Sequence, residues 1–137
     1  MKFLVDANVL SEATRPLPDA GVLDWLQQNE GDLAVNPIIL GELEFGILKL
    51  PTGRRRDSLM RWFETGARIL PVLDLDAATS RHWAKLLADL RSQGKAMPVK
   101  DSLIAVTALQ HRLTLVTRNT KDFLCTSVPL LNPFRNM

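Results

Sequence analysis

Four acidic residues stand at positions where carboxylates can do chemistry, namely Asp6, Glu42, Asp101 and Asp122. If the fold gathers them they repel one another, because two carboxylates about 4 Å apart are opposed by roughly 4 kcal/mol at an effective dielectric of about 20. Such a cluster takes up protons or binds cations. Oxygen ligands without histidine or cysteine favour Mg²⁺ or Mn²⁺, and these ions activate water for attack on a phosphodiester. The acids therefore predict nuclease chemistry.

Two of the acids follow predicted strands. Asp6 comes directly after the apolar run Lys2–Val5, and Asp122 lies in the polar loop after Leu113–Val116. Open parallel sheets build their sites at the carboxyl ends of their strands, so both residues are expected at one edge of the sheet. Ordinary turn or helix-capping chemistry is the competing interpretation for each.

Glu42 lies in a stretch so apolar, Ile38–Ile47, that we expect a helix buried along much of its circumference. A charge inside such a helix needs a partner. Gly41 and Gly46 lower helix propensity and suit the close approach of another backbone or a ligand. The alternative is that Glu42 and Glu44 mark a narrow stripe facing solvent.

Asp101 opens a predicted core helix, Asp101–Leu109, that contains no other acidic group. Ala105 and Ala108 lie on the same helix face and leave room beside the carboxylate. An aspartate that only complements the helix dipole is the alternative. Lys100 could pair with a carboxylate or contact a phosphate. However, consecutive helix residues point about 100° apart, so Lys100 points away from its neighbour Asp101 and we expect a solvated lysine.

The elements that must position these acids alternate along the chain. Short runs rich in β-branched residues alternate with helix-length amphipathic stretches, which is typical of βαβ units. We predict an α/β fold, a three-layer α/β/α sandwich whose central sheet is mostly parallel and has four to five strands. The predicted strands are Lys2–Val5, Leu33–Val35, Ile69–Leu73, Leu113–Val116 and Val128–Leu131.

Local start and stop signals predict the helices. One predicted helix follows Asp19 and runs through Leu26, and a second begins at Asn36 with Pro37 in its first helical position. A third runs from Asp76 or Thr79 to about Arg91, and a fourth runs from Pro98 to about His111. The three tryptophans, Trp25, Trp62 and Trp83, fall within helical stretches and are expected to pack in the core or at a subunit interface. The two histidines, His82 and His111, are expected on helix surfaces or at a helix end.

Composition sets limits on the class of protein. The chain has 137 residues and 46% hydrophobic content, which predicts one domain over residues 1–137. Cys125 stands alone, so it forms no internal disulfide and is expected to be a partly buried small hydrophobe. No apolar run reaches the roughly 18 residues of a membrane span, so we expect a cytoplasmic protein without a membrane partner. The net charge of +2 only permits a nucleic-acid partner, and Arg54–Arg56 is more typical of a solvated helix start.

Four segments of the chain resemble the PIN-domain motifs of VapC and FitB-like toxins. They are Phe3–Leu10, Gly41–Leu43, Asp101–Ala105 and Leu115–Phe123. The resemblance spans nearly the whole chain, and the order, spacing and total length of the segments carry it together. It implies an endoribonuclease that acts as the toxin of a type II toxin-antitoxin system.

The resemblance also implies roles for individual residues. Asp6 and Asp101 become the main Mg²⁺ or Mn²⁺ ligands, with Glu42 and Asp122 completing the acidic pocket. Three short polar residues support them, Asn8, Thr117 and Asn119. The implied partners are an RNA substrate, a second copy of the chain in a homodimer, and a VapB-like or FitA-like antitoxin whose tail blocks the pocket, often with a basic side chain, in a larger assembly.

A regulatory binding module without nuclease activity is the alternative from another class. A receiver-like phospho-acceptor domain also has aspartates at strand ends, but its first strand usually precedes an acidic pair, and Asp6-Ala7-Asn8 offers none. A PIN-like protein that binds without cutting is a further alternative, although such a protein has no reason to keep a self-repelling cluster.

Overall fold

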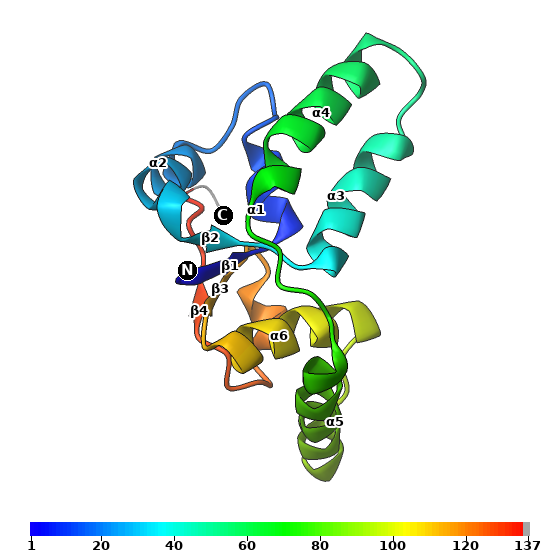
Figure 1. The fold of residues 1–137 in the computed structure, drawn as a ribbon. Helices are drawn as coiled ribbons and strands as arrows, with labels where there is room; N and C mark the ends of the chain where they lie inside the picture. Colours follow the sequence, from blue (N-terminus) through cyan, green and yellow to red (C-terminus); the bar gives the residue numbers. More distant parts are fainter. Residues whose placement is uncertain (136–137) are drawn as a thin grey trace.

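A four-stranded parallel sheet forms the centre of the computed structural model, which describes residues 1–135 (Figure 1). The strand order is β2-β1-β3-β4, and all three neighbouring pairs are parallel. The strands are β1 (Phe3–Val5), β2 (Leu33–Ala34), β3 (Thr114–Val116) and β4 (Leu130–Leu131). The predicted parallel sheet of four to five strands is thus confirmed with four.

The register of the two central strands sets the position of the first acid. Leu4 pairs with Leu115 and Val5 with Val116, and all four side chains are fully buried. The pairing continues one residue further, because the backbone N–H of Asp6 donates to the carbonyl of Val116 at 2.9 Å. Asp6 therefore stands at the carboxyl edge of the sheet, as its place after an apolar run predicts.

The strand predicted over Ile69–Leu73 is wrong. Residues Ala67–Ile69 form a 3₁₀ helix, η2, and Ile69 is 73% exposed. Only Val72 approaches the sheet, in an isolated parallel bridge to Val35. Pro71 accepts one hydrogen bond from the Val35 N–H but has no N–H of its own to donate, which keeps the bridge from growing into a ladder.

Six α-helices surround the sheet within the described residues. They are α1 (Ala7–Glu12), α2 (Ala20–Asn29), α3 (Pro37–Leu48), α4 (Arg54–Thr65), α5 (Ala77–Ser92) and α6 (Val99–His111). Short 3₁₀ helices, η1 (Glu30–Asp32) and η3 (Thr120–Phe123), complete the element order with η2. The predicted helices all exist, although α2 runs past Leu26, and α1 is an additional short helix that Asp6 caps.

The predicted caps are observed where the sequence indicates them. The side chain of Asp19 accepts from the N–H groups of Gly21 and Val22, and that of Asn36 from the N–H of Ile39 ahead of Pro37. Asp76 rather than Thr79 caps α5, in a capping box that the two residues share. These bonds satisfy backbone donors that a helix start otherwise leaves unpaired.

The helices form layers on both sides of the strands (Figure 1). Helix α6 packs against β1 and β3 and carries α5 on its outer side. Helices α1 and α2 lie on the other side of the strands, and α3 and α4 form an antiparallel pair beside them. The three-layer α/β/α prediction is therefore confirmed.

Helix α3 is less buried than predicted. Its apolar residues extend around the helix, but Phe45 is 66% exposed and Leu48 is 47% exposed, so the helix is buried on one side only. No atom lies within 4 Å of a Cβ added at Gly41 or Gly46, so no other backbone approaches these glycines closely.

The aromatic side chains serve the core as predicted. Trp25 meets Phe3 edge to face at a ring distance of 4.9 Å, and the Nε1–H of Trp83 donates to Ser102 Oγ at 3.0 Å. Trp62 is also packed against the core, whereas His82 and His111 are exposed. Across residues 1–135, no helix has both the length and the apolar character needed to cross a membrane.

A candidate carboxylate site at the edge of the sheet

The carboxylate of Asp6 is almost completely buried, with 6% of the residue exposed. Its Oδ1 accepts from the N–H of Ala7 at 2.8 Å, which caps α1, and its Oδ2 accepts from the Thr117 hydroxyl at 2.8 Å. Burial raises the pKa of Asp6 above its ordinary value, while these hydrogen bonds and the nearby charge of Lys100 lower it. Asp6 thus caps α1 and also faces the candidate site, so the two interpretations do not exclude each other.

Thr117 and Asn8 form the hydrogen-bonded support of Asp6. Thr117 is fully buried, and its hydroxyl accepts from Asn8 Nδ2 at 3.3 Å and from the N–H of Asn119 at 3.1 Å. Asn8 Nδ2 also lies 3.4 Å from Asp6 Oδ2. The three residues named as supporting ones therefore gather beside Asp6, although Asn119 does so through its backbone and its side chain is exposed.

Glu42 faces the same edge from α3 and forms an ion pair. Its Oε2 lies 3.1 Å from Nζ of Lys100, at the start of α6, while its Oε1 is buried and has no hydrogen-bond partner within the described residues. The prediction of a merely solvated Lys100 is therefore wrong, because the lysine stem is long enough to reach the neighbouring helix. A buried oxygen without a donor is costly unless another group or ion satisfies it.

Asp101 and Asp122 approach the site from α6 and η3. Asp101 is half-buried in the first turn of α6, and Asp122 is exposed. The N–H of Asp122 donates to the carbonyl of Asn119 at 3.0 Å, which fixes the backbone of this loop. Burial is the main reason that the pKa of Asp101 is raised, and the negative charge of Asp122 raises it further.

Mutual repulsion links all four acids. The pKa of Glu42 is raised first by burial, while Lys100 lowers it and the charges of Asp6 and Asp101 raise it. The pKa of Asp101 is raised first by burial and then by Asp122 and Asp6, against the opposing effect of Lys100. Glu42 and Asp101 therefore each have another acid of the set close enough to affect their pKa, while the gathering of all four acids around one metal stays a prediction.

The carboxylate oxygens of these residues are the kind of ligand that a hard cation prefers. Among residues 1–135, no three Asp, Glu, His or Cys side chains are close enough together to hold a metal ion as they stand. The buried Glu42 Oε1 nevertheless lacks a partner, and the neighbouring acids are held in partly desolvated surroundings that disfavour charge. Carboxylate oxygens of this kind suit Mg²⁺ or Mn²⁺.

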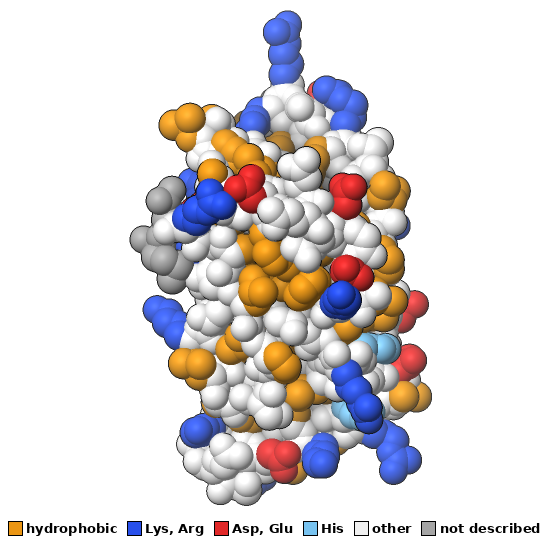
Figure 2. Space-filling model, turned by 90° about the vertical axis from the view of Figure 1, so that its left-hand side faces the viewer, with side chains coloured by type: hydrophobic (Ala, Val, Ile, Leu, Met, Phe, Trp, Pro, Cys, Tyr) orange, Lys and Arg blue, Asp and Glu red, His pale blue; other side chains and the backbone are white. Residues whose placement is uncertain are grey.

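Charge on the surface is mixed rather than segregated on the face drawn in Figure 2. Lysine and arginine side chains are scattered over that face, carboxylates lie between them, and apolar side chains gather near its centre. The small net charge of +2 agrees with this pattern. Any nucleic-acid contact therefore has to be sought in local placement rather than in overall charge.

Comparisons with known proteins agree with the fold. The family model for the PIN domain matches residues 3–125. The plasmid stability protein StbB of Pseudomonas syringae pv. tomato is 37% identical over 96% of this chain and 98% of its own. The VapC ribonuclease Y4jK of Sinorhizobium fredii is 35% identical over 96% and 97%. The crystal structure of FitAcB from Neisseria gonorrhoeae superposes with a TM-score of 0.88, at 32% identity and 96% and 97% coverage.

The chain therefore belongs to the PIN-domain family. Within that family it is similar to VapC ribonuclease and FitB toxin, so the resemblance read from its motifs is confirmed.

Proposed function

We propose that this chain is a Mg²⁺- or Mn²⁺-dependent endoribonuclease of one domain, acting in the cytoplasm as the toxin of a type II toxin-antitoxin pair. The buried Oε1 of Glu42, which has no hydrogen-bond partner within residues 1–135, carries the proposal, because a bound cation would satisfy it; the raised pKa values of Glu42 and Asp101, caused first by burial and in part by other acids, support it. The ribonuclease and toxin names of its relatives support it.

Four carboxylates would hold the metal: Asp6 and Asp101 as main ligands, with Glu42 and Asp122 completing the set. When bound, Mg²⁺ or Mn²⁺ lowers the pKa of a water and stabilises the oxygen that leaves the phosphodiester. Thr117 holds Asp6 in one orientation through the 2.8 Å hydrogen bond. Lys100 lies beside Glu42 with a half-exposed side chain, where its ammonium is available to an RNA phosphate.

An antitoxin segment is the protein partner of this proposal. A cavity of about 240 Å³ between α1, α3 and α4 has apolar walls that include Leu43, Leu59 and Trp62. Its other lining includes Asn8 and Glu42, so the apolar groove leads into the acidic site. An apolar segment that ends in a basic side chain matches this combination. Relatives solved as members of toxin-antitoxin systems support the assignment.

A second copy of the chain completes the proposed assembly. Phe45 and Leu48 leave much of their apolar surface exposed on α3. Isolated surface apolar residues are ordinary, but two on a helix that is apolar around its circumference suit contact with another protein surface. The homodimer stays a prediction, which the molecular mass in solution tests.

Brief expression followed by sequencing of cellular RNA ends tests the activity and names the RNA. We expect new 5′ ends and growth arrest with the wild type, and neither with Asp6→Asn. Asp57→Asn, at an exposed position on α4, is the matched control and should behave as wild type. Purified wild type should cleave RNA with Mg²⁺ or Mn²⁺ and stop with EDTA. Cleavage by Asp6→Asn at the wild-type rate would contradict the proposal, and absence of cleavage by every variant would favour the regulatory module.

A further inference from the structure

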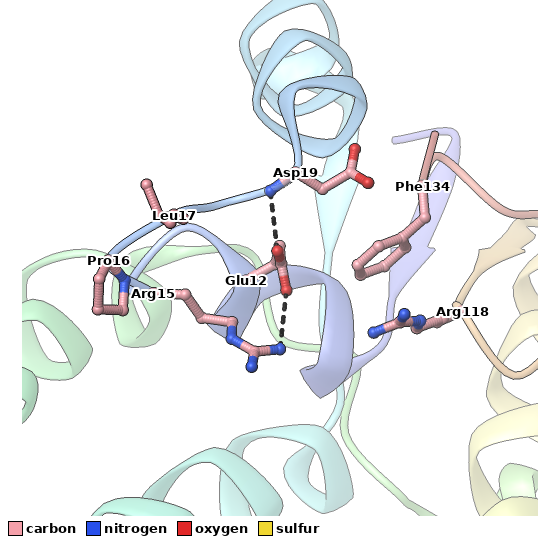
Figure 3. A pocket seen from close by; sticks show the side chains of 7 residues that line it. All are labelled: Glu12, Arg15, Pro16, Leu17, Asp19, Arg118 and Phe134. Atoms are coloured by element: carbon pink, nitrogen blue, oxygen red, sulfur yellow. Dashed lines mark hydrogen bonds and ion pairs between the residues drawn. The ribbon is translucent and has the colours of Figure 1, made fainter. Parts of the chain in front are cut away.

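A second cavity is connected to the carboxylate site through Arg118 and Asn8. Its volume is about 420 Å³, and it lies between the end of α1, the loop that follows α1, the loop after β3 and the C-terminal segment (Figure 3). Arg15 and Arg118 reach toward this cavity from opposite walls, and Phe134 lies above Arg118. Neither arginine has a role in the chemistry assigned to the four acids.

Hydrogen bonds connect this cavity directly to the carboxylates. The backbone N–H of Arg118 donates to Asn8 Oδ1 at 3.1 Å, and Asn8 Nδ2 lies 3.4 Å from Asp6 Oδ2. Arg118 also follows Thr117, whose hydroxyl binds Asp6. The cavity is therefore one side chain away from the position where a phosphodiester would react.

The guanidinium of Arg118 is held in place without being neutralised. Its central carbon lies 4.7 Å from the centre of the Phe134 ring, and Phe134 is only 8% exposed, so the stacking surface is fixed. Throughout residues 1–135, this guanidinium has no hydrogen bond and no ion pair. Stacking on an aromatic ring leaves the N–H groups at the edge of the guanidinium free to bind an anion.

The acids of the cavity wall are occupied by the fold. Glu12 is 6% exposed, and its Oε2 accepts from the N–H of Asp19 at 2.8 Å. Asp19 in turn caps α2. Arg15 Nη1 is 3.6 Å from Glu12 Oε1, and the arginine side chain is 63% exposed, so its other N–H groups remain available. The wall therefore combines satisfied carboxylates with two cations that can take an incoming anion.

We propose that this cavity is a subsite for single-stranded RNA, in which Arg118 and Arg15 bind the phosphate of a nucleotide that flanks the cleaved bond. This inference rests on the proposed function, because it assumes that RNA reaches the four acids. The volume lies within the range of small-ligand pockets and accommodates a nucleotide. Arginine is suited to the contact because it binds phosphate with two parallel N–H groups, which lysine does not.

Binding of RNA without cleavage tests the subsite. The probe is a fluorescein-labelled single-stranded RNA hexamer of mixed sequence, titrated in EDTA and followed by anisotropy. We expect Arg118→Ala to weaken binding about tenfold and to reduce the slope of log Kd against log salt by about one. Arg118→Lys should recover only part of the affinity, and Arg15→Ala should weaken it less, because Arg15 also pairs with Glu12.

Arg81→Ala is the matched control, since Arg81 is exposed on α5 and does not line the cavity. The backbone bond from residue 118 to Asn8 survives in Arg118→Ala, so thermal melting should show an intact fold. Equal RNA affinity of Arg118→Ala and Arg81→Ala would overturn the subsite, as would an Arg118→Ala variant that keeps RNA binding and loses only a coexpressed antitoxin. If the wild type neither binds nor cleaves RNA, the proposed function itself fails.

Discussion

Nζ of Lys100 lies 3.1 Å from Oε2 of Glu42, while Oε1 of the same carboxylate is buried and has no hydrogen-bond partner among residues 1–135. One oxygen of Glu42 is thus occupied by an internal cation and the other is left for a further donor or ion. The lysine lowers the pKa of Glu42, and its charge also reaches Asp6 and Asp101. Lys100 therefore supplies a positive charge at the place where the proposed function puts a metal ion.

Removing Lys100 should therefore strengthen metal binding. In Lys100→Met the ammonium no longer competes for Glu42 or repels a divalent ion, and we expect Mn²⁺ to bind about fivefold tighter, the factor that corresponds to about 1 kcal/mol for a partly exposed pair. Isothermal titration with Mn²⁺ measures this. Lys85→Met, at an exposed position on α5, should leave the affinity unchanged. Weaker binding by Lys100→Met would show that the lysine supports the ion instead.

Thr117→Val should reduce RNA cleavage about 10- to 100-fold, as for loss of a group that orients a metal ligand. The substitution removes the hydroxyl that donates to Asp6 Oδ2 and leaves the N–H of Asn119 without its acceptor. Because both groups are close to the buried site, we also expect a loss of about 1–3 kcal/mol in unfolding free energy. Thr117→Ser retains the hydroxyl and should keep most activity. An equal loss in Thr117→Ser, which keeps the hydroxyl, would show that the hydroxyl alone does not account for the effect.

As the pH is lowered, metal affinity should begin to fall at a higher pH than it would for carboxylates with ordinary pKa values. The pKa values of Asp6, Glu42 and Asp101 are all raised, mainly by burial, and a carboxylate must lose its proton to bind a metal. Mn²⁺ titrations across pH 4–8 measure the change, whose midpoint should lie above the usual carboxyl range. A midpoint at the ordinary pKa of aspartate would argue against a desolvated cluster.

Neutralising Asp101 should stabilise the metal-free protein. The raised pKa means that the folded chain holds a proton to higher pH than the unfolded chain, so unfolding free energy decreases as pH rises through the interval between the two pKa values. At neutral pH we expect Asp101→Asn to raise Tm by about 2–5 °C while abolishing cleavage. Glu64→Gln, at an exposed position, is the control. A lowered Tm for Asp101→Asn would mean that its carboxylate supports the fold.

Sequence patterns correctly predicted features that depend on residues close together in the chain. Asp6 follows an apolar run, and strand pairing then brings it to the sheet edge. Asn36 and Asp76 start helices where capping requires a short acceptor side chain. The prediction of Ile69–Leu73 as a strand failed, because β-branched composition does not show that Pro71 limits pairing or that Ile69 is exposed.

Contacts between distant segments were beyond prediction from one sequence. Lys100 was expected in solvent because helical periodicity describes where a Cβ points and not how far a long side chain reaches. Arg118 lies in the segment Leu115–Phe123 that resembles a PIN motif, but its role was not predicted, because its environment is made by Phe134 and by the loop after α1. The signal that was available is its position between Thr117 and Asn119, two residues already assigned to the site.

The bond between Thr117 and Asp6 joins residues 111 positions apart. A chain emerging from the ribosome presents Asp6 well before β3, the strand that pairs with β1 and completes the surroundings of Asp6. During synthesis the acids are therefore spread along an unfinished chain, and their gathering waits for the last strands to pair. Under the proposed function, no assembled nuclease site exists beside the translating ribosome until β3 and the loop after it have emerged.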